Sequence, residues 1–376
     1  MEYRTFEKTG ESISLLGFGT MRLPTLPDKN IDEAEAVKMI HHAIDNGVNY
    51  MDTAYVYHGG TSESVLGKAL KDGYREKVFI ADKMPVWSVN CESDLQRLFD
   101  EQLARLGVQS IDMYLVHNLN VPLWKQTKKF NILDFLEKKR GEGKIKHIGF
   151  SFHDDLSLFK EIIDAYAWDF CQIQLNYMDV KWQAGVEGLK YAGGKGIPVI
   201  IMEPLKGGRL TDAFPENVSE LWKGVGTERT PADWALRWVA DFPEVLTILS
   251  GMSSFAQVEE NIRILSSVTA NSLTEKEHAV IGKVSAAYNE LVQYPCTACG
   301  YCLPCTQGID IPLAMNLYNE WFMFAQSEKT QLAFALEFPG SPAPADCTKC
   351  KHCEEHCPQH LNVSEMMEKS VGLFSK

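Results

Sequence analysis

Residues 14–265 alternate short β-rich runs with helical segments eight times. Each run is rich in aliphatic and aromatic residues, and several helical segments end in Gly just before the next run. The runs lie at 14–20, 49–54, 78–83, 111–117, 145–152, 170–176, 198–204 and 245–251. A last helical segment follows at 254–265. Few folds accommodate eight such repeats.

Eight strand-helix units in about 250 residues match the usual size of a closed barrel. We therefore predict an α/β fold, a (β/α)8 TIM barrel. The alternative is an open, doubly wound parallel sheet, which usually carries a Gly-rich phosphate-binding fingerprint after its first strand. The stretch GFGTMRLP at 17–24 lacks the GxGxxG spacing of that fingerprint.

The pattern changes after about residue 290. From there to residue 376 the strand-helix alternation stops, and all but two of the cysteines appear. We predict a barrel domain over residues 1–290 and a small α-helical, ferredoxin-like iron-sulfur domain over residues 291–376. Between the cysteine groups, residues 311–326 are aromatic and are predicted to form a helix that packs within the tail or against the barrel.

The second cysteine group has the spacing C-x2-C-x2-C-x3-C-P, which is that of a bacterial 4Fe-4S ferredoxin run. Its members are Cys347, Cys350, Cys353 and Cys357. Such crowding favours a compact cluster, whereas zinc ribbons place paired cysteines farther apart. Structural zinc is the alternative. Because disulfides are rare in a reducing cytoplasm, clustered cysteines there indicate metal or redox chemistry.

The first group comprises Cys296, Cys299, Cys302 and Cys305. It departs from the ferredoxin spacing, because two residues precede its last cysteine and Thr306 stands in place of the proline. In two-cluster ferredoxins the fourth cysteine of each run ligates the other cluster. We therefore predict one 4Fe-4S cluster on Cys296, Cys299, Cys302 and Cys357, and a second on Cys347, Cys350, Cys353 and Cys305. Cys91 and Cys171 are predicted to be ordinary residues.

The composition argues against several classes of function. The formal net charge of −13 argues against a nucleic-acid partner, because phosphate neutralisation needs clustered Lys and Arg. The chain has no run of eighteen apolar residues, and MEYRTFEKTGES lacks the apolar core of a signal peptide. We expect a cytoplasmic protein with no membrane partner.

Four titratable residues fall at or just after the ends of three consecutive predicted strands, where a (β/α)8 barrel builds its active site. They are Asp52, Tyr57, Lys83 and His117. The ordinary pKa of Tyr is about 10, and a neighbouring ammonium lowers that pKa by favouring the phenolate. A carboxylate would hold the ammonium, and His would donate a hydrogen bond to a carbonyl oxygen. These residue types predict one catalytic site.

The segments DTAYVYHGGTSESVLGKAL, VFIADK and IDMYLVHNL resemble motifs of the aldo-keto reductase family, over roughly residues 1–265. The resemblance implies a barrel that binds NADPH or NADH without a Rossmann domain and transfers hydride to an aldehyde or ketone. It implies that Tyr57 is the general acid, that Lys83 and Asp52 tune it, and that His117 orients the carbonyl group. The partner would be a small-molecule carbonyl or alcohol substrate.

The same resemblance implies contacts to the nicotinamide. Ser151 and Gln172 match residues that hold its carboxamide, and Asn176 neighbours that site. Phe152 stands where Asn is frequent in the family. Met202 takes the place of the aromatic residue that commonly stacks on the nicotinamide ring, where a thioether can also pack.

The stretch LSGMSSFAQVEEN resembles the family's loop and helix start after the last strand, where the adenosine phosphates bind. The matching positions are Ser250, Gly251, Ser253, Gln257, Glu260 and Asn261. N–H groups at a helix N-terminus suit phosphate. Because Gly251 and Gln257 stand where Lys and Arg often grip the 2′-phosphate of NADPH, NADH stays an open alternative.

Along its whole length the chain resembles aldo-keto reductases fused to a two-cluster ferredoxin-like tail. Three interpretations remain open. The first is a nicotinamide-dependent carbonyl reductase or alcohol dehydrogenase whose clusters are structural or exchange electrons with a one-electron carrier protein. The second is an electron-transfer protein with the barrel as scaffold, and the third is a nicotinamide-binding redox sensor. Hydride transfer moves two electrons together whereas each cluster moves one, so a flavin would normally mediate between them.

Two further features bear on partners and substrate. The tail carries five Lys or Arg and nine Asp or Glu, so an acidic ferredoxin would need a local basic patch to bind it. Trp87 and Trp124 lie in predicted pocket-shaping loops at 84–89 and 121–130, and each is interpreted either as packing or as a pocket wall.

Overall fold

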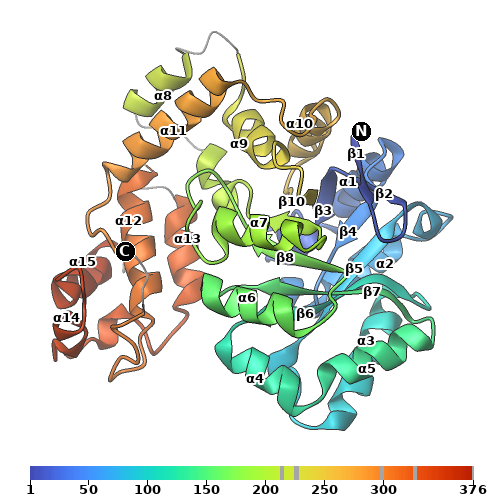
Figure 1. Cartoon of the computed structure of the whole chain (residues 1–376), viewed down its shortest axis with the longest axis horizontal. Helices are drawn as coiled ribbons and strands as arrows, with labels where there is room; N and C mark the ends of the chain where they lie inside the picture. Colours follow the sequence, from blue (N-terminus) through green and yellow to red (C-terminus); the bar gives the residue numbers. More distant parts are fainter. Residues whose placement is uncertain (212–215, 224–227, 297–299, 325–327, 375–376) are drawn as a thin grey trace. The chain divides into compact units, whose positions relative to one another are not determined.

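The computed structural model describes residues 1–211, 216–223, 228–296, 300–324 and 328–374. The chain forms two compact units (Figure 1). The barrel unit comprises Met1–Pro204 and Ala232–Leu273, and the cysteine unit comprises Leu205–Pro231 and Thr274–Lys376. Among the described residues, no helix has the length and apolar character needed to cross a membrane.

Eight parallel strands close into a barrel, in which β10 pairs with β3 to complete the ring. The strands are β3 (Leu16–Gly19), β4 (Tyr50–Asp52), β5 (Phe79–Met84), β6 (Ile111–Leu119), β7 (Ile145–Phe152), β8 (Phe170–Gln174), β9 (Val199–Met202) and β10 (Val245–Gly251). Each contains residues of one predicted β-rich run. The predicted (β/α)8 barrel is therefore confirmed, and closure of the ring excludes the open-sheet alternative.

The helices of the barrel unit lie around this sheet (Figure 1). They are α1 (Glu33–Asp45), α2 (Ser62–Ala69), α3 (Glu92–Leu106), α4 (Val121–Lys129), α5 (Ile132–Gly141), α6 (Leu156–Ala165), α7 (Gly185–Gly194), α9 (Pro231–Ala240) and α10 (Phe255–Leu265). Gly107 follows α3 with a φ of 67°, which glycine adopts without strain, and so ends the helix before the next strand.

Two elements differ from the sequence-based expectation. The segment 121–130, predicted as a loop, contains α4, because the Asn120 side chain caps it by accepting from the N–H of Leu123 at 2.9 Å. An antiparallel hairpin, β1 (Tyr3–Phe6) and β2 (Glu11–Ser14), precedes the barrel. Its side chains Phe6 and Ile13 are fully buried in a cluster with barrel-strand residues.

Helices make up most of the described cysteine unit. They are α8 (Glu216–Lys223), α11 (Glu275–Asn289), α12 (Ile311–Met323), α13 (Glu328–Glu337), α14 (His352–Glu355) and α15 (Val363–Phe374). The predicted aromatic helix is α12, which shares a buried apolar cluster with α15 that includes Met315, Val363 and Met367. The domain boundary predicted at residue 291 lies just after α11, inside the cysteine unit.

A buried ion-pair group ties residues 205–211 to α12 within the cysteine unit. The carboxylate of Glu320, on α12, lies 2.9 Å from the ammonium of Lys206 and 2.9 Å from Nε of Arg209. Glu320 is 1% exposed. A buried carboxylate is tolerated only when it is paired, so loss of both cations would leave an uncompensated charge in this unit.

Candidate active site and cysteine sites

The ends of three neighbouring strands bring the predicted catalytic residues together. Asp52 is the last residue of β4, Lys83 lies in β5, and His117 lies in β6. Tyr57 starts the short 3-10 helix Tyr57–Gly60 that follows β4. Because β4, β5 and β6 are parallel neighbours, their carboxyl ends meet at one mouth of the barrel.

The lysine is held between the carboxylate and the phenol. Its Nζ lies 2.7 Å from Oδ2 of Asp52 and donates to the backbone oxygen of Thr53 at 2.6 Å. Nζ also lies 5.0 Å from the centroid of the Tyr57 ring. Lys83 is fully buried and Asp52 is nearly so, whereas Tyr57 is partly exposed. A phenol at the edge of a buried ion pair can meet both the pair and a bound substrate.

Burial is the largest single influence on the pKa of each of these three residues, although it does not decide the net direction for Lys83. Burial raises the pKa of the Tyr57 phenol, and the Lys83 ammonium lowers that pKa only in part. Burial lowers the pKa of Lys83, but Asp52 and Tyr57 outweigh it and leave that pKa raised. Burial also raises the pKa of Asp52 against the opposing effect of Lys83. The lowered Tyr57 pKa predicted from residue types is therefore wrong in net direction, although Lys83 acts in the predicted sense.

His117 is directed toward the tyrosine by an irregularity in β6. The β6–β7 register shifts between Val116 and Leu119, and Asn118 has a φ of 58°, which non-glycine residues rarely adopt. The rings of His117 and Tyr57 stand edge to face, with centroids 6.3 Å apart. Burial, together with Lys83, sets the pKa of His117 well below its ordinary value. The imidazole is therefore neutral and offers an N–H donor.

The two tryptophans have different roles. Trp87 is 38% exposed, and its ring lies 5.0 Å from that of His117, so it lies beside the predicted catalytic group. Trp124 is buried in α4, and its indole N–H donates to Glu161 at 2.8 Å. The Trp124 side chain therefore contributes to packing and does not form a pocket wall.

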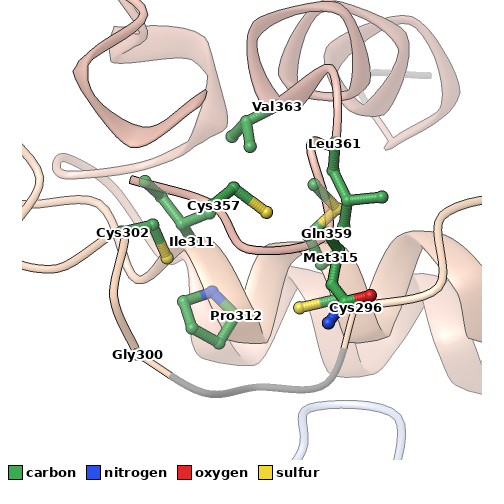
Figure 2. Close-up of a pocket in the computed structure, with 10 residues that line it drawn as sticks. All are labelled: Cys296, Gly300, Cys302, Ile311, Pro312, Met315, Cys357, Gln359, Leu361 and Val363. Atoms are coloured by element: carbon green, nitrogen blue, oxygen red, sulfur yellow. The ribbon is translucent and has the colours of Figure 1, made fainter. Parts of the chain in front are cut away.

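The cysteines fall into two cavities within the cysteine unit. The first cysteine cavity is lined by Cys296 and Cys302, and by Cys357 from the second group, whose side chains surround a common space (Figure 2). The remaining described side chains that line it are Ile311, Pro312, Met315, Gln359, Leu361 and Val363. Cys299, predicted to belong to this set, lies outside the described residues.

The second cysteine cavity contains the complementary set. Its cysteines are Cys305, Cys347, Cys350 and Cys353. Cys350 is exposed, and the other three are half-buried. The structure thus groups the last cysteine of each run with the other run, which is the crossed arrangement that the sequence predicts. Thiolate ligands arranged in this way suit two 4Fe-4S clusters.

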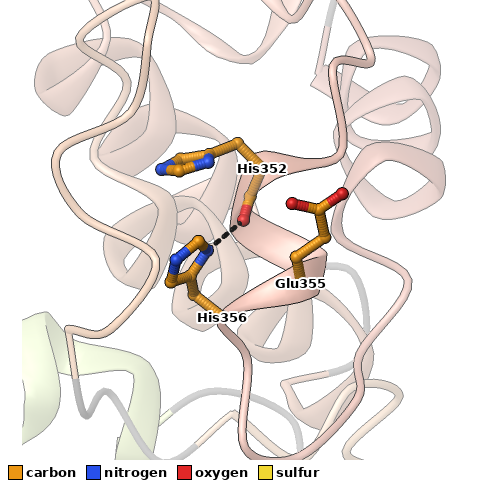
Figure 3. A group of neighbouring side chains, drawn as sticks. All are labelled: His352, Glu355 and His356. Atoms are coloured by element: carbon orange, nitrogen blue, oxygen red, sulfur yellow. Dashed lines mark hydrogen bonds between the residues drawn. The ribbon is translucent and has the colours of Figure 1, made fainter.

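A third group of potential metal ligands lies on α14 and directly after it. Potential ligand atoms of His352, Glu355 and His356 lie within 4.8 Å of one another, and all three residues are exposed (Figure 3). Nδ1 of His356 contacts the backbone oxygen of His352 at 2.8 Å. Neither cysteine cavity is lined by these residues, so this group is separate from the cysteine sites.

A model of the aldo/keto reductase family matches residues 15–285, which is more than half of the sequence. The chain belongs to the aldo/keto reductase family. Residues 295–362 match a 4Fe-4S dicluster domain, which indicates two 4Fe-4S clusters in the C-terminal region of this aldo/keto reductase and favours iron-sulfur over structural zinc. The predicted family, its barrel and its iron-sulfur tail are confirmed.

Curated relatives resemble the barrel part of this aldo/keto reductase. L-galactose dehydrogenase from Arabidopsis thaliana is 28% identical over 285 residues, which cover 70% of this chain and 87% of that protein. The uncharacterized oxidoreductase YrpG from Bacillus subtilis (strain 168) is 27% identical over 305 residues, which cover 70% of this chain and 90% of that protein.

Solved aldo-keto reductase structures share the barrel. The holo form of AKR11C1 from Bacillus halodurans has a TM-score of 0.62 and 25% identity, covering 76% of this chain and 96% of that one. An aldo/keto reductase from Klebsiella pneumoniae, in complex with NADP and acetate, has a TM-score of 0.58 and 25% identity, covering 74% of this chain and 93% of that one.

Three predicted nicotinamide contacts lie at consecutive strand ends of this aldo/keto reductase. Ser151, in β7, is 2% exposed and accepts a hydrogen bond from the N–H of Asn118 at 2.8 Å. Gln172, in β8, donates to the sulfur of Met202 at 3.5 Å, and its Oε1 is buried without a partner in the described part of the chain. A buried carbonyl oxygen of this kind fits the amide N–H of a carboxamide.

Two neighbouring residues are engaged elsewhere. The Nδ2 of Asn176 donates to Asp179 at 2.8 Å and to the backbone oxygen of Glu203 at 3.2 Å. Asn176 therefore stabilises the segment that follows β8. Phe152 is fully buried and packs edge to face on Phe159 of α6, with centroids 5.2 Å apart. Phe152 is therefore part of the packing between β7 and α6.

The residues predicted to meet the adenosine phosphates surround the start of α10. Ser250 and Asn261 are buried and joined by a 2.9 Å hydrogen bond, whereas Gly251, Ser253 and Gln257 are exposed. Ser253 donates its N–H to Oε1 of Gln257 at 2.8 Å. Glu260 is half-buried, and its carboxylate is 4.0 Å from Arg263. Ser254, which sequence reasoning did not single out, caps α10.

Arg22 is a further residue that sequence reasoning missed. It lies after β3, and its side chain covers Gly251 so closely that a Cβ at position 251 would approach the Arg22 methylenes to 3.1 Å. Its guanidinium is 3.5 Å from the carboxylate of Glu203. The side chain of a basic residue therefore passes over Gly251. Only the fold reveals this, because Arg22 is far away in sequence.

Sequence reasoning also missed two buried acids near Lys83, the predicted catalytic lysine. Oδ1 of Asp82 accepts from the backbone N–H of Lys83 at 2.8 Å, and Glu63 pairs with Arg105 at 2.8 Å. Burial, and next to it Glu63, raises the pKa of Asp82 well above its ordinary value. Alternation along β5 places Asp82 on the opposite face from Lys83, so a strand-end motif search selects only the lysine.

Proposed function

We propose that the barrel is an NAD(P)H-dependent oxidoreductase that transfers hydride between the nicotinamide and an aldehyde or ketone. The observation that carries this proposal is the grouping of Asp52, Lys83, Tyr57 and His117 at the carboxyl ends of three adjacent strands. A phenol held next to an ammonium, and facing a neutral imidazole, is the donor set that a developing alkoxide needs.

The nicotinamide, when bound, supplies the hydride for the carbonyl carbon. Tyr57 would donate its phenolic proton to the carbonyl oxygen, and the Lys83 ammonium would stabilise the phenolate that remains. Asp52 would keep Lys83 charged and in place through their 2.7 Å contact. The N–H of His117 would donate to the same oxygen and fix its direction. Trp87 would shield this side of the site from water.

The raised pKa of Tyr57 predicts the pH dependence of carbonyl reduction. Reduction uses the protonated phenol, so kcat/KM is expected to stay level up to about pH 10, the ordinary Tyr value, and to fall at higher pH. Oxidation of the alcohol uses the phenolate and is expected to rise with pH. Initial rates in both directions, measured across pH 6–11 (roughly the range that brackets the Tyr pKa), would contradict this if reduction already fell near neutrality.

We propose Ser151, Gln172 and Met202 as the residues that hold the nicotinamide, and the start of α10 as the phosphate site.

Arg22→Ala is expected to raise the KM for the preferred nucleotide about tenfold or more, because hydrogen bonds between charged groups contribute about 1.5–3 kcal/mol. Steady-state titrations with NADPH and NADH check this, with the surface variant Lys8→Ala as control. An unchanged KM would remove Arg22 from the nucleotide site, and a loss confined to NADPH would place it at the 2′-phosphate.

We propose that the eight clustered cysteines ligate the two clusters in the crossed sets, and that the clusters exchange single electrons with a carrier protein. The crossed composition of the two cavities supports the ligation. The exposure of Cys350 supports electron exchange, because it brings one cluster edge to the surface. The alternative, a purely structural pair of clusters, predicts that no one-electron carrier is reduced or oxidised by the protein.

One anaerobic experiment tests both the carbonyl reductase activity and the presence of two clusters. The protein is reconstituted and washed with a chelator, because His352, Glu355 and His356 offer an exposed set of ligands that could retain extra metal. About eight irons are expected. NADH and NADPH are then added with a panel of aldehydes and ketones, while absorbance and low-temperature EPR follow the clusters. Cluster reduction without turnover of any carbonyl would contradict the reductase and favour the electron-transfer protein.

A further inference from the structure

Two histidines and a glutamate come together on one short helical turn of the cysteine unit. His352, Glu355 and His356 have the spacing i, i+3 and i+4, which places side chains on one face of a helical turn. Potential ligand atoms of the three residues lie within 4.8 Å of one another, and the two imidazole rings have centroids 4.4 Å apart (Figure 3). Three potential metal ligands therefore converge on one side of this turn.

A backbone hydrogen bond sets the tautomer of one of these histidines. Nδ1 of His356 lies 2.8 Å from the backbone oxygen of His352, and because a carbonyl oxygen can only accept, Nδ1 carries the hydrogen. The neutral ring then has its lone pair on Nε2, which is the atom that would bind a metal. Metal-binding histidines usually donate their other ring N–H in this way, because the hydrogen bond orients the ring and makes the ligand more basic.

The backbone of this turn is anchored at both ends. Lys351 precedes the turn with a φ of 61°, and its backbone oxygen accepts from the N–H groups of Glu354 and Glu355. The carboxylate of Glu354 accepts from the backbone N–H of Ser364 at 2.9 Å and from its hydroxyl at 2.5 Å, which joins α14 to α15. Glu354 therefore stabilises the turn, whereas the exposed Glu355 can turn its carboxylate toward an ion.

The composition of the group selects the kind of ion. Imidazole nitrogens suit zinc, copper and nickel, whereas magnesium and calcium prefer carboxylate, carbonyl and water oxygens. Two imidazoles and one carboxylate form the protein ligands of some zinc sites, in which water takes the fourth position. Zinc bonds of about 2.0–2.2 Å place tetrahedral ligands about 3.4 Å apart. Rotations of these exposed side chains suffice to close the observed spacing of up to 4.8 Å.

We infer that His352, Glu355 and His356 form a third metal site, which binds one zinc-like divalent ion with water completing its coordination. The site lies in the segment between Cys350 and Cys357, so the bound ion adds positive charge to a segment that supplies predicted cluster ligands. The inference depends neither on carbonyl reduction nor on the crossed ligation proposed above.

The test uses the anaerobically reconstituted full chain, which is washed with a chelator and then dialysed against buffered Zn²⁺. One zinc per chain is expected in addition to about eight irons. Zinc K-edge absorption spectroscopy is expected to show nitrogen and oxygen ligands at about 2.0–2.2 Å, with imidazole scattering, and no sulfur at about 2.3 Å. The iron content is measured in the same samples, so a failure of cluster assembly is recognised separately from a failure of zinc binding.

The single variants His352→Gln, Glu355→Gln and His356→Gln each remove one ligand. Each is expected to raise the Kd for zinc about tenfold or more, because loss of even a supporting group behind a ligand costs about 10–100-fold. His360→Gln is the matched control, because His360 is exposed in the same region and does not belong to the group. It is expected to bind zinc like the wild type.

Four results would overturn the inference. Zinc could fail to bind to the wild type, or it could bind through sulfur ligands. The three ligand variants could bind zinc as tightly as the wild type does. His360→Gln could weaken binding as much as the ligand variants do. The spectroscopic result on the wild type decides the question even if a variant fails to fold.

Discussion

Tyr57→Phe is expected to lower kcat/KM for carbonyl reduction by about 10²–10⁴, the usual contribution of a general acid. The substitution removes only the phenolic oxygen, so the Lys83–Asp52 pair at 2.7 Å and the His117 ring stay in place. Nucleotide affinity is expected to change little. Single-turnover kinetics with NADPH or NADH, together with nucleotide titration by fluorescence, separate the chemical step from binding.

Tyr55→Phe is the matched control, because Tyr55 lies in the same segment but its hydroxyl donates to Glu101 at 2.7 Å. It is expected to cost about 1 kcal/mol of stability, the usual net value of one hydrogen bond, and to leave turnover nearly unchanged. If Tyr57→Phe retained full turnover, Tyr57 would not be the acid. Equal losses in both variants would indicate that the loop, rather than the phenol, had been damaged.

Paired cysteine substitutions are expected to distinguish crossed from uncrossed ligation. In the crossed arrangement Cys302 and Cys357 belong to one cluster, so the double Ala variant loses that cluster and keeps the other intact. Cys350 and Cys357 then belong to different clusters, so their double Ala variant damages both. Iron content and EPR of the reduced proteins measure this, with about four irons and one unperturbed spectrum expected for the first variant.

Uncrossed ligation predicts the reverse outcome. Cys350 and Cys357 would then share a cluster, and the Cys350/Cys357 variant would keep one intact spectrum while the Cys302/Cys357 variant lost both. Cys91→Ala/Cys171→Ala is the control pair, because neither residue lines a cysteine cavity. That pair is expected to retain about eight irons.

The barrel could be predicted because the sequence signals for each strand and helix lie within short segments. Alternation of β-rich and helical runs, with glycines such as Gly107 between them, is readable within each repeat. The hairpin β1–β2 was not predicted, because its strands are four residues long and its buried side chains Phe6 and Ile13 are stabilised by barrel residues distant in sequence. Helix α4 was missed because residues 121–130 were predicted as a loop, although Asn120 directly before them caps a helix.

Part of the candidate site could be predicted, because the carboxyl ends of neighbouring parallel strands lie close together in a barrel. Asp52, Lys83 and His117 follow from the position of each residue in its strand, and the structure brings them together. The net pKa direction of Tyr57 did not follow, because it depends on how completely the surrounding chain excludes water. Arg22 was also inaccessible to motif reasoning, since its approach to Gly251 exists only in the folded barrel.

The crossed grouping of cysteines has a consequence for how the protein is made. Cys357, close to the end of the chain, lines the same cavity as Cys296, and Ile311 and Val363 line both cavities. Neither cysteine cavity is therefore complete until the chain has been synthesised through Val363. Iron and sulfide are expected to be held only after that point in synthesis. Truncation shortly before residue 357 is then expected to remove Cys357 from the first cysteine cavity and Val363 from both cavities.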